Sequence, residues 1–103
     1  MNRLRAKKER FTEEVDVVAL NGTTVVAVAE AKWTNKPLSA KVLADLVEFK
    51  LPAMLQSGLE VSVPEIVLAS KSGFSDGLVD EAAKNTNVTL VDARQLLSDL
   101  TSR

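Results

Sequence analysis

The sequence predicts an α/β protein built on a mixed β-sheet, and three observations support this fold class. Two apolar segments flank Asn21-Gly22, a residue pair that strongly favours the tight turn of a β-hairpin. After residue 33, helical and strand patterns alternate, which predicts parallel strands joined by right-handed crossovers. The length of 103 residues and the 46% hydrophobic content fit one small globular domain spanning residues 1–103.

The hairpin is followed by an α-β-α-β-α run. Pro52 kinks or ends the first helix, and Gly58 closes that region. Because segment 24–33 is apolar at both alternating positions, we expect helices to cover its strand on both faces. In chain order, the predicted elements are strands over 11–20 and 24–33, a helix over 39–51 capped by Ser39, a strand over 65–69 after Pro64, a helix over 75–84 capped by Ser75, a strand over 87–91 and a helix over 93–100. The inward stripe of the first helix is predicted to be Val42, Leu43, Leu46, Val47 and Lys50.

Composition limits the chemistry that the chain can use. It contains no cysteine and no histidine, so thiol chemistry and the commonest general base are excluded. Catalysis would therefore use carboxylates, lysines, hydroxyls and a metal ion. No apolar run is long enough to span a membrane and no signal-peptide pattern opens the chain, so we expect a cytoplasmic protein without a membrane partner.

The first ten residues form a basic leader in this interpretation. They contain five basic residues and one acidic residue, although the net charge of the whole chain is −1. Two interpretations stay open: an arm that contacts phosphate groups, or a solvated segment ahead of the first strand.

Three charged residues interrupt the apolar strands of the hairpin: Asp16, Glu30 and Lys32. A buried charge is unfavourable unless it is paired or coordinates a metal, so these positions are candidates for a site. Glu30 and Lys32 are two residues apart and project from one face of a strand. The cluster predicts a site for a divalent metal and water activation. The alternative is a plain ion pair, either between Glu30 and Lys32 or between Asp16 and Lys32.

The register of the hairpin decides whether this site exists. A regular two-residue turn at Asn21-Gly22 would place Asp16 and Glu30 on opposite faces, because the side-chain period of a strand is two. The site therefore requires a three-residue loop, with Gly22 in the left-handed region, or a β-bulge.

The motif Glu14-x-Asp16…Glu30-x-Lys32, followed by α-β-α-β, resembles the PD-(D/E)xK nuclease superfamily. Two segments look most similar to one branch of this superfamily: Glu-Ala-Lys-Trp-Thr-Asn-Lys-Pro from residue 30 and Ser-Lys-Ser-Gly-Phe-Ser from residue 70. That branch is the nuclease-like domain at the C-terminus of many prokaryotic P-loop ATPases. The resemblance covers about residues 11–100 and implies a restriction-endonuclease-like core. It also implies a helix ahead of the hairpin, for which the first ten residues are too few, so this N-terminal helix is expected to be missing.

The resemblance also implies roles for individual residues. Asp16, Glu30 and the carbonyl of Ala31 would hold Mg²⁺ or Mn²⁺, and Glu14 could assist. Lys32 would position or deprotonate the attacking water. Two loop residues, Lys36 and Lys71, would contact DNA phosphates, although solvated loop lysines are equally common. Trp33, the sole tryptophan, is interpreted as a core or interface residue.

Two functions follow as expectations. The first is a metal-dependent DNA nuclease domain that hydrolyses phosphodiester bonds. The alternative is a catalytically inactive DNA-binding or dimerisation module from the C-terminus of a prokaryotic ATPase, whose P-loop motif is absent from this chain. With no helix left to cover the hairpin, an apolar sheet surface would be exposed, and we expect a homodimer that buries it.

Overall fold

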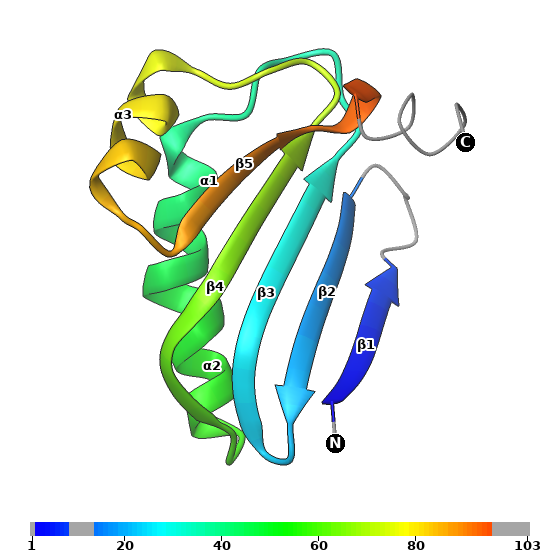
Figure 1. The fold of residues 1–103 in the computed structure, drawn as a ribbon, viewed down its shortest axis with the longest axis vertical. Helices are drawn as coiled ribbons and strands as arrows, with labels where there is room; N and C mark the ends of the chain where they lie inside the picture. The colour runs from blue at the N-terminus through cyan, green and yellow to red at the C-terminus, as the bar shows by residue number, and fades with distance from the viewer. Residues whose placement is uncertain (1, 9–13, 96–103) are drawn as a thin grey trace.

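The structure, a computed structural model, describes residues 2–8 and 14–95, which form a five-stranded sheet with helices packed against it (Figure 1). The strands lie in sequence order across the sheet. The pairs β1–β2 and β2–β3 are antiparallel, whereas β3–β4 and β4–β5 are parallel, so the sheet is mixed as predicted. The strands are β1 (Asn2–Lys8), β2 (Glu14–Asn21), β3 (Thr24–Lys32), β4 (Glu60–Ser70) and β5 (Val88–Asp92).

The helical segments supply the two crossovers between the parallel strands. Between β3 and β4 the chain forms one continuous helical stretch of α1 (Ala40–Asp45), the π-helical turn η1 (Leu46–Lys50) and α2 (Leu51–Gln56). Between β4 and β5 it forms α3 (Asp76–Lys84), whose N-cap Ser75 accepts a hydrogen bond from the Leu78 N–H at 3.1 Å, as predicted. Residues 93–95 are helical, and the rest of the helix predicted over 93–100 lies outside the described residues. None of the described helices is long and apolar enough to cross a membrane.

The core lies between these helices and one face of the sheet. Because both crossovers run in the same direction along the sheet and share one handedness, α1, α2 and α3 cover the same face. Helices on both faces were expected, and for the described residues that expectation is wrong. The buried apolar side chains of this core are Leu20, Val25, Val28, Leu38, Leu43, Leu46, Ile66, Leu68 and Leu78.

The opposite face, here called the far face, carries small and half-buried side chains. Those on β2, β3 and β4 are Val17, Ala19, Ala27, Ala29, Ala31, Val67 and Ala69. No helix in the described part of the chain lies over them. The predicted homodimer therefore concerns this far face.

We expect light scattering at micromolar concentration to report a dimer, because pairing two far faces would bury their apolar surface. Ala29, at the centre of the far face, is then the position to change. Ala29→Arg should give a monomer, since an arginine would be buried without a partner in the dimer. Ala53→Arg, on the exposed side of α2, is the control and should leave the dimer intact. A wild-type monomer would refute this prediction.

The segment before the hairpin is a strand and not the expected basic leader. β1 pairs with β2 along its whole length, from Asn2 opposite Asn21 to Lys8 opposite Val15. Without it β2 would be an edge strand with unsatisfied backbone groups, which β1 satisfies. A lysine- and arginine-rich strand suits the edge of a sheet, because charges oppose further strand pairing. The prediction of a leader over residues 1–10 is therefore wrong for residues 2–8.

The hairpin contains the β-bulge that the site required. Ala19 pairs with Ala27 but Leu20 pairs with Val25, so Val26 is the extra residue. The turn itself has two residues, Gly22 and Thr23, with Gly22 at φ 65°. The three-residue loop is thus wrong, although Gly22 has the left-handed conformation predicted with it, and the alternative of a bulge is confirmed. Its consequence is that Asp16 pairs directly with Glu30.

Pro52 does not end the helix, because the π turn accommodates it. The Leu51 N–H donates to the Leu46 carbonyl, five residues back, in the turn just before Pro52. Proline lacks the N–H that an α-helix would use at this point, and its ring crowds the carbonyl four residues earlier, so a widened turn relieves both problems. The helix continues to Gln56 and closes at Gly58, φ 100°, as predicted.

The start of one strand also differs from prediction. β4 begins at Glu60, ahead of Pro64, and its pairing with β3 is irregular between Val61 and Glu65, where the proline lies. A proline cannot donate to the ladder, so it is tolerated at such an irregularity. The Asn87 side chain donates to the Pro64 carbonyl at 3.0 Å.

Candidate functional site

Four charged residues form a block at one end of the hairpin. Asp16 is the register partner of Glu30, and Glu14 is the partner of Lys32. Paired residues share a face and positions two apart share a face, so all four belong to the helix-covered side of the sheet. Directly opposed residues have Cβ atoms about 4.5–5.5 Å apart, and like charges there are destabilising. Two opposed acidic positions therefore need a cation close by.

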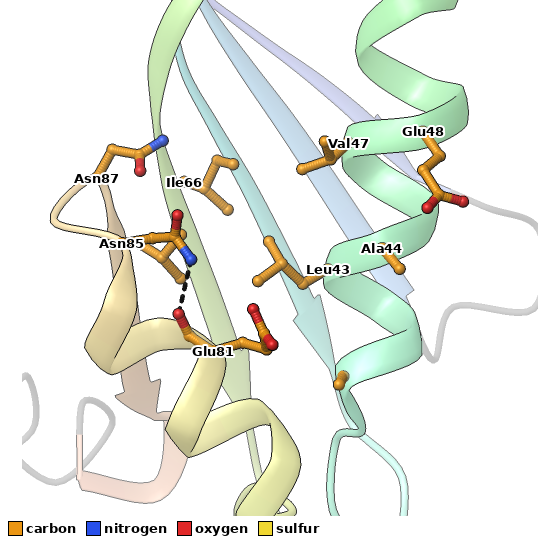
Figure 2. Close-up of a pocket in the computed structure, with 10 residues that line it drawn as sticks. Leu43, Ala44, Val47, Glu48, Ile66, Glu81, Asn85 and Asn87 are labelled. Atoms are coloured by element: carbon orange, nitrogen blue, oxygen red, sulfur yellow. Dashed lines mark hydrogen bonds between the residues drawn. The ribbon is translucent and has the colours of Figure 1, made fainter.

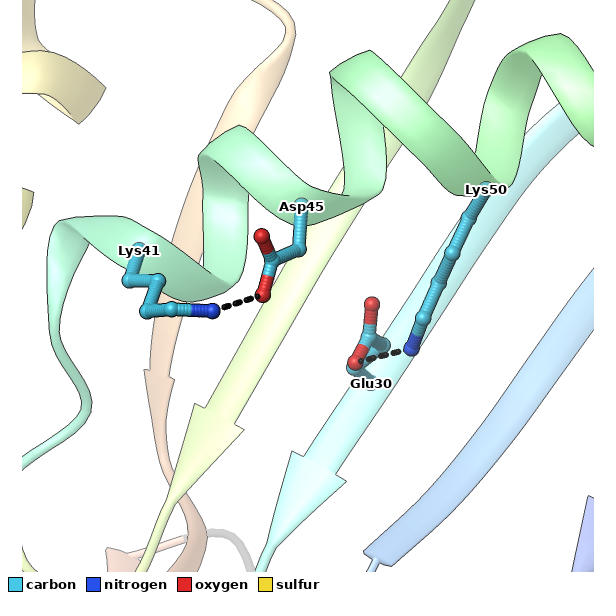
Figure 3. Close-up of polar contacts among 4 residues, drawn as sticks. All are labelled: Glu30, Lys41, Asp45 and Lys50. Carbon is cyan, nitrogen blue, oxygen red and sulfur yellow. Dashed lines mark hydrogen bonds and ion pairs between the residues drawn. The ribbon is translucent and has the colours of Figure 1, made fainter.

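Glu30 is the central residue of this block. It lies in the middle of the sheet, between Asp16 on β2 and Leu68 on β4, and is only 2% exposed. Its Oε1 atom accepts a hydrogen bond from the Lys50 ammonium at 3.0 Å, which is also an ion pair (Figure 3). A buried carboxylate requires such compensation, because an unpaired charge in the core is strongly unfavourable.

Lys50 is the last residue of the π turn η1. Figure 3 shows its side chain reaching from the helix down to β3. The widened turn alters the angular position of the following residues, and Leu51, outside the predicted stripe, packs against the core. Sequence reasoning placed Lys50 in the apolar stripe of the helix but did not assign it to the site. A lysine at a stripe position, two residues before a proline, was the available signal.

Lys32 lies two residues after Glu30 on the same face of β3, at the carboxyl end of the strand. Its partner on β4 is Ser70, which in turn pairs with Asp92 on β5. Ser70 is buried, and its hydroxyl accepts from the Ser72 N–H at 3.1 Å. Ligands of open α/β sheets bind outside the carboxyl ends of the strands, which is where this row of polar residues lies.

The loops after β3 and β4 are joined at this edge. The Lys71 ammonium donates to the Asn35 side chain at 2.9 Å, and the Ser72 hydroxyl donates to the Thr34 carbonyl. The Leu38 N–H donates to the Gly73 carbonyl at 2.9 Å. The structure thus brings Lys36, which is exposed, and Lys71 into one loop pair beside Lys32.

Trp33 follows Lys32 directly and is 42% exposed, so it is not a core residue. Of the two predicted roles, core or interface, the core role is wrong, because β3 ends at Lys32; the interface role stays a prediction. An exposed indole beside a candidate site can report on ligand binding.

Asp16 and Glu30 fit a hard divalent cation in donor type. Carboxylate oxygen is the ligand that Mg²⁺ prefers, and Mg²⁺ is usually held by one or two carboxylates, with waters and substrate oxygens completing its shell. Among the side chains that the structure describes, no group of three acidic, histidine or cysteine residues gathers at one point. The side chains of Glu14 and Asp16 lie outside those that the structure describes, so the candidate metal site rests on the register, which pairs Asp16 with Glu30 and Glu14 with Lys32.

A separate open groove lies between α1–η1 and α3 (Figure 2), with a volume of about 440 Å³. Its charged lining residues are Glu48 and Glu81, and the lining described contains no lysine or arginine. An acidic rim repels phosphate, so this groove does not suit a nucleic acid. It also explains the exposure of Val47, 49%, which was predicted to face the core but lies where the two helices diverge.

The chain matches none of the protein-family models, curated proteins or solved structures with which it was compared. The resemblance to PD-(D/E)xK nucleases therefore stays a prediction, carried by the residues described above.

Proposed function

We propose that this chain is a metal-dependent DNA nuclease domain with a restriction-endonuclease-like core, which hydrolyses phosphodiester bonds. The observation that carries the proposal is the register of the hairpin. A β-bulge at Val26 places Asp16 opposite Glu30, with Lys32 one register step further toward the edge. Without this bulge, residues 16 and 30 would lie on opposite faces of the sheet. The motif requires them on one face, and the observed register meets this requirement.

Each residue has a role under this proposal. Asp16 and Glu30 hold the metal, with the Ala31 carbonyl and Glu14 as auxiliary donors. Bound Mg²⁺ would supply Lewis-acid stabilisation and lower the pKa of its water, which explains how hydrolysis proceeds without histidine. Lys32 orients the attacking water and offsets the negative charge that develops on the phosphate. Lys36 and Lys71 contact neighbouring DNA phosphates from the joined loops.

The second candidate is an inactive DNA-binding or dimerisation module, derived from the C-terminus of an ATPase. One observation favours it. The Lys50 ammonium already compensates Glu30 at 3.0 Å, so the buried carboxylate is satisfied in part without any metal. In this candidate the charged block only stabilises the fold.

Metal binding separates the two candidates. We expect millimolar Mn²⁺ to raise the melting temperature of the wild type, because a ligand that binds only the folded state stabilises it by about 2.7 kcal/mol at 100 times its Kd. Asp16→Ala should remove this shift, while Asp80→Ala, an exposed change on α3, should retain it. An unchanged melting temperature in the wild type would favour the inactive module.

A further inference from the structure

We propose that Lys50 is an exchangeable counter-ion of Glu30, which a divalent cation displaces when it binds. The inference rests on the proposed function, since it requires that the metal uses the Glu30 carboxylate. It assigns to this helix residue the control of metal affinity, a role separate from that of Lys32.

The first argument is competition for one carboxylate. The Lys50 ammonium lies 3.0 Å from Glu30 Oε1, on a side chain that is 2% exposed. A metal ion bound to this carboxylate would bring a second positive charge close to the ammonium, and like charges repel strongly in a poorly solvated site. Lys50 and the metal are therefore expected to exclude each other.

The second argument is that Lys50 can leave without a change in the fold. Its side chain is 37% exposed, so the core does not enclose it along its whole length, although its ammonium meets a buried carboxylate. A lysine has a flexible four-carbon stem and can turn its charge toward water by rotation about side-chain bonds. Its backbone lies in a π turn, a feature frequent at functional sites in helices.

Lys41 provides a matched control on the same helical stretch. Its ammonium pairs with Asp45 at 2.8 Å, but that side chain is 78% exposed and Asp45 is itself 40% exposed (Figure 3). Such a surface pair contributes little to stability. A change at Lys41 removes the same charge from the same helix without touching Glu30.

The test is a calorimetric titration with Mn²⁺ of the wild type, Lys50→Met, Lys50→Arg and Lys41→Met. Methionine keeps the apolar stem of Lys50 and removes its charge, so we expect Mn²⁺ to bind about tenfold more tightly. Lys50→Arg retains the charge and should stay within about threefold of the wild type, as should Lys41→Met. The fluorescence of Trp33, the sole tryptophan, gives an independent readout of the same titration.

Stability supplies the second readout. Without metal, Lys50→Met should lower the melting temperature by about 5–10 °C, because Glu30 loses a charged partner. Saturating Mn²⁺ should recover most of this loss, since the metal then compensates the carboxylate. Lys41→Met should leave the melting temperature unchanged, both without metal and in saturating Mn²⁺.

The outcomes separate this inference from the proposed function. If Mn²⁺ bound neither the wild type nor Lys50→Met, both the proposed metal-dependent function and the counter-ion exchange would be refuted. Binding to the wild type with equal or weaker affinity for Lys50→Met would overturn the exchange alone and leave the metal site standing. Tighter binding to Lys50→Met, with the controls unchanged, supports the exchange.

Discussion

Replacing Lys32 by methionine is expected to lower the rate of metal-dependent DNA cleavage by about 10²- to 10⁴-fold, the usual contribution of a positioned proton-transfer group. Its position one register step from Glu30 suits a group that acts on the attacking water. Because Lys32 is not one of the proposed metal donors, the affinity for Mn²⁺ should change by less than about threefold. Initial rates on a linear DNA duplex, together with the Mn²⁺ titration, measure the two effects separately.

Lys36→Met is the control for this prediction. Lys36 is exposed in the loop after β3, so its loss should weaken DNA binding and leave the turnover of bound DNA nearly unchanged. Cleavage that survives Lys32→Met but disappears in Lys50→Met would contradict the assignment and give the water-positioning role to the helix lysine.

The face shared by Asp16 and Glu30 could be argued from sequence because strand geometry has a period of two. That periodicity excludes a regular two-residue turn at Asn21-Gly22 if both carboxylates serve one site. It does not decide between a longer loop and a bulge, which depends on how the turn packs. The structure has the bulge at Val26, and Gly22 adopts the left-handed conformation that a short turn requires.

The strand β1 was missed because its sequence has little intrinsic preference for a sheet. Four of its seven residues are arginine or lysine, and none is β-branched or aromatic. It becomes a strand because β2 otherwise ends the sheet with unpaired backbone groups. This reason exists only in the folded sheet, so local sequence patterns could not supply it.

Lys50 was missed as a site residue because helical periodicity predicts the side of a helix that a residue occupies, but not the side chain that it meets across the core. The regular stripe placed both Val47 and Lys50 inward, whereas in the structure, which has a π turn over residues 46–50, Lys50 reaches Glu30 and Val47 is 49% exposed. Pro52 is the physical reason for that turn, but a proline in a helical pattern more often predicts an end or a kink. Which of these outcomes occurs depends on the packing of Leu46 and Leu51 against the sheet.

Leu68→Ala is expected to have the largest effect on stability. Leu68 is 0% exposed and pairs with Glu30 and Leu90 in the sheet, so the change leaves a cavity beside the carboxylate. Such changes destabilise by about 2–5 kcal/mol, a large part of the 5–15 kcal/mol that typically holds a domain folded.

We expect Leu68→Ala to reduce the free energy of unfolding in urea by about 3 kcal/mol, with an unchanged dependence on urea concentration. Leu55→Ala, at an exposed position on α2, should change it by less than about 0.5 kcal/mol. The proposed metal site would depend on the same packing, because Leu68 is the register neighbour of Glu30 and limits where its carboxylate can lie. Mn²⁺ affinity should therefore fall in Leu68→Ala, measured where the protein is still folded. A loss of stability below about 1 kcal/mol would mean that the sheet and the helix close over the cavity, and the position of Glu30 would then not depend on this leucine.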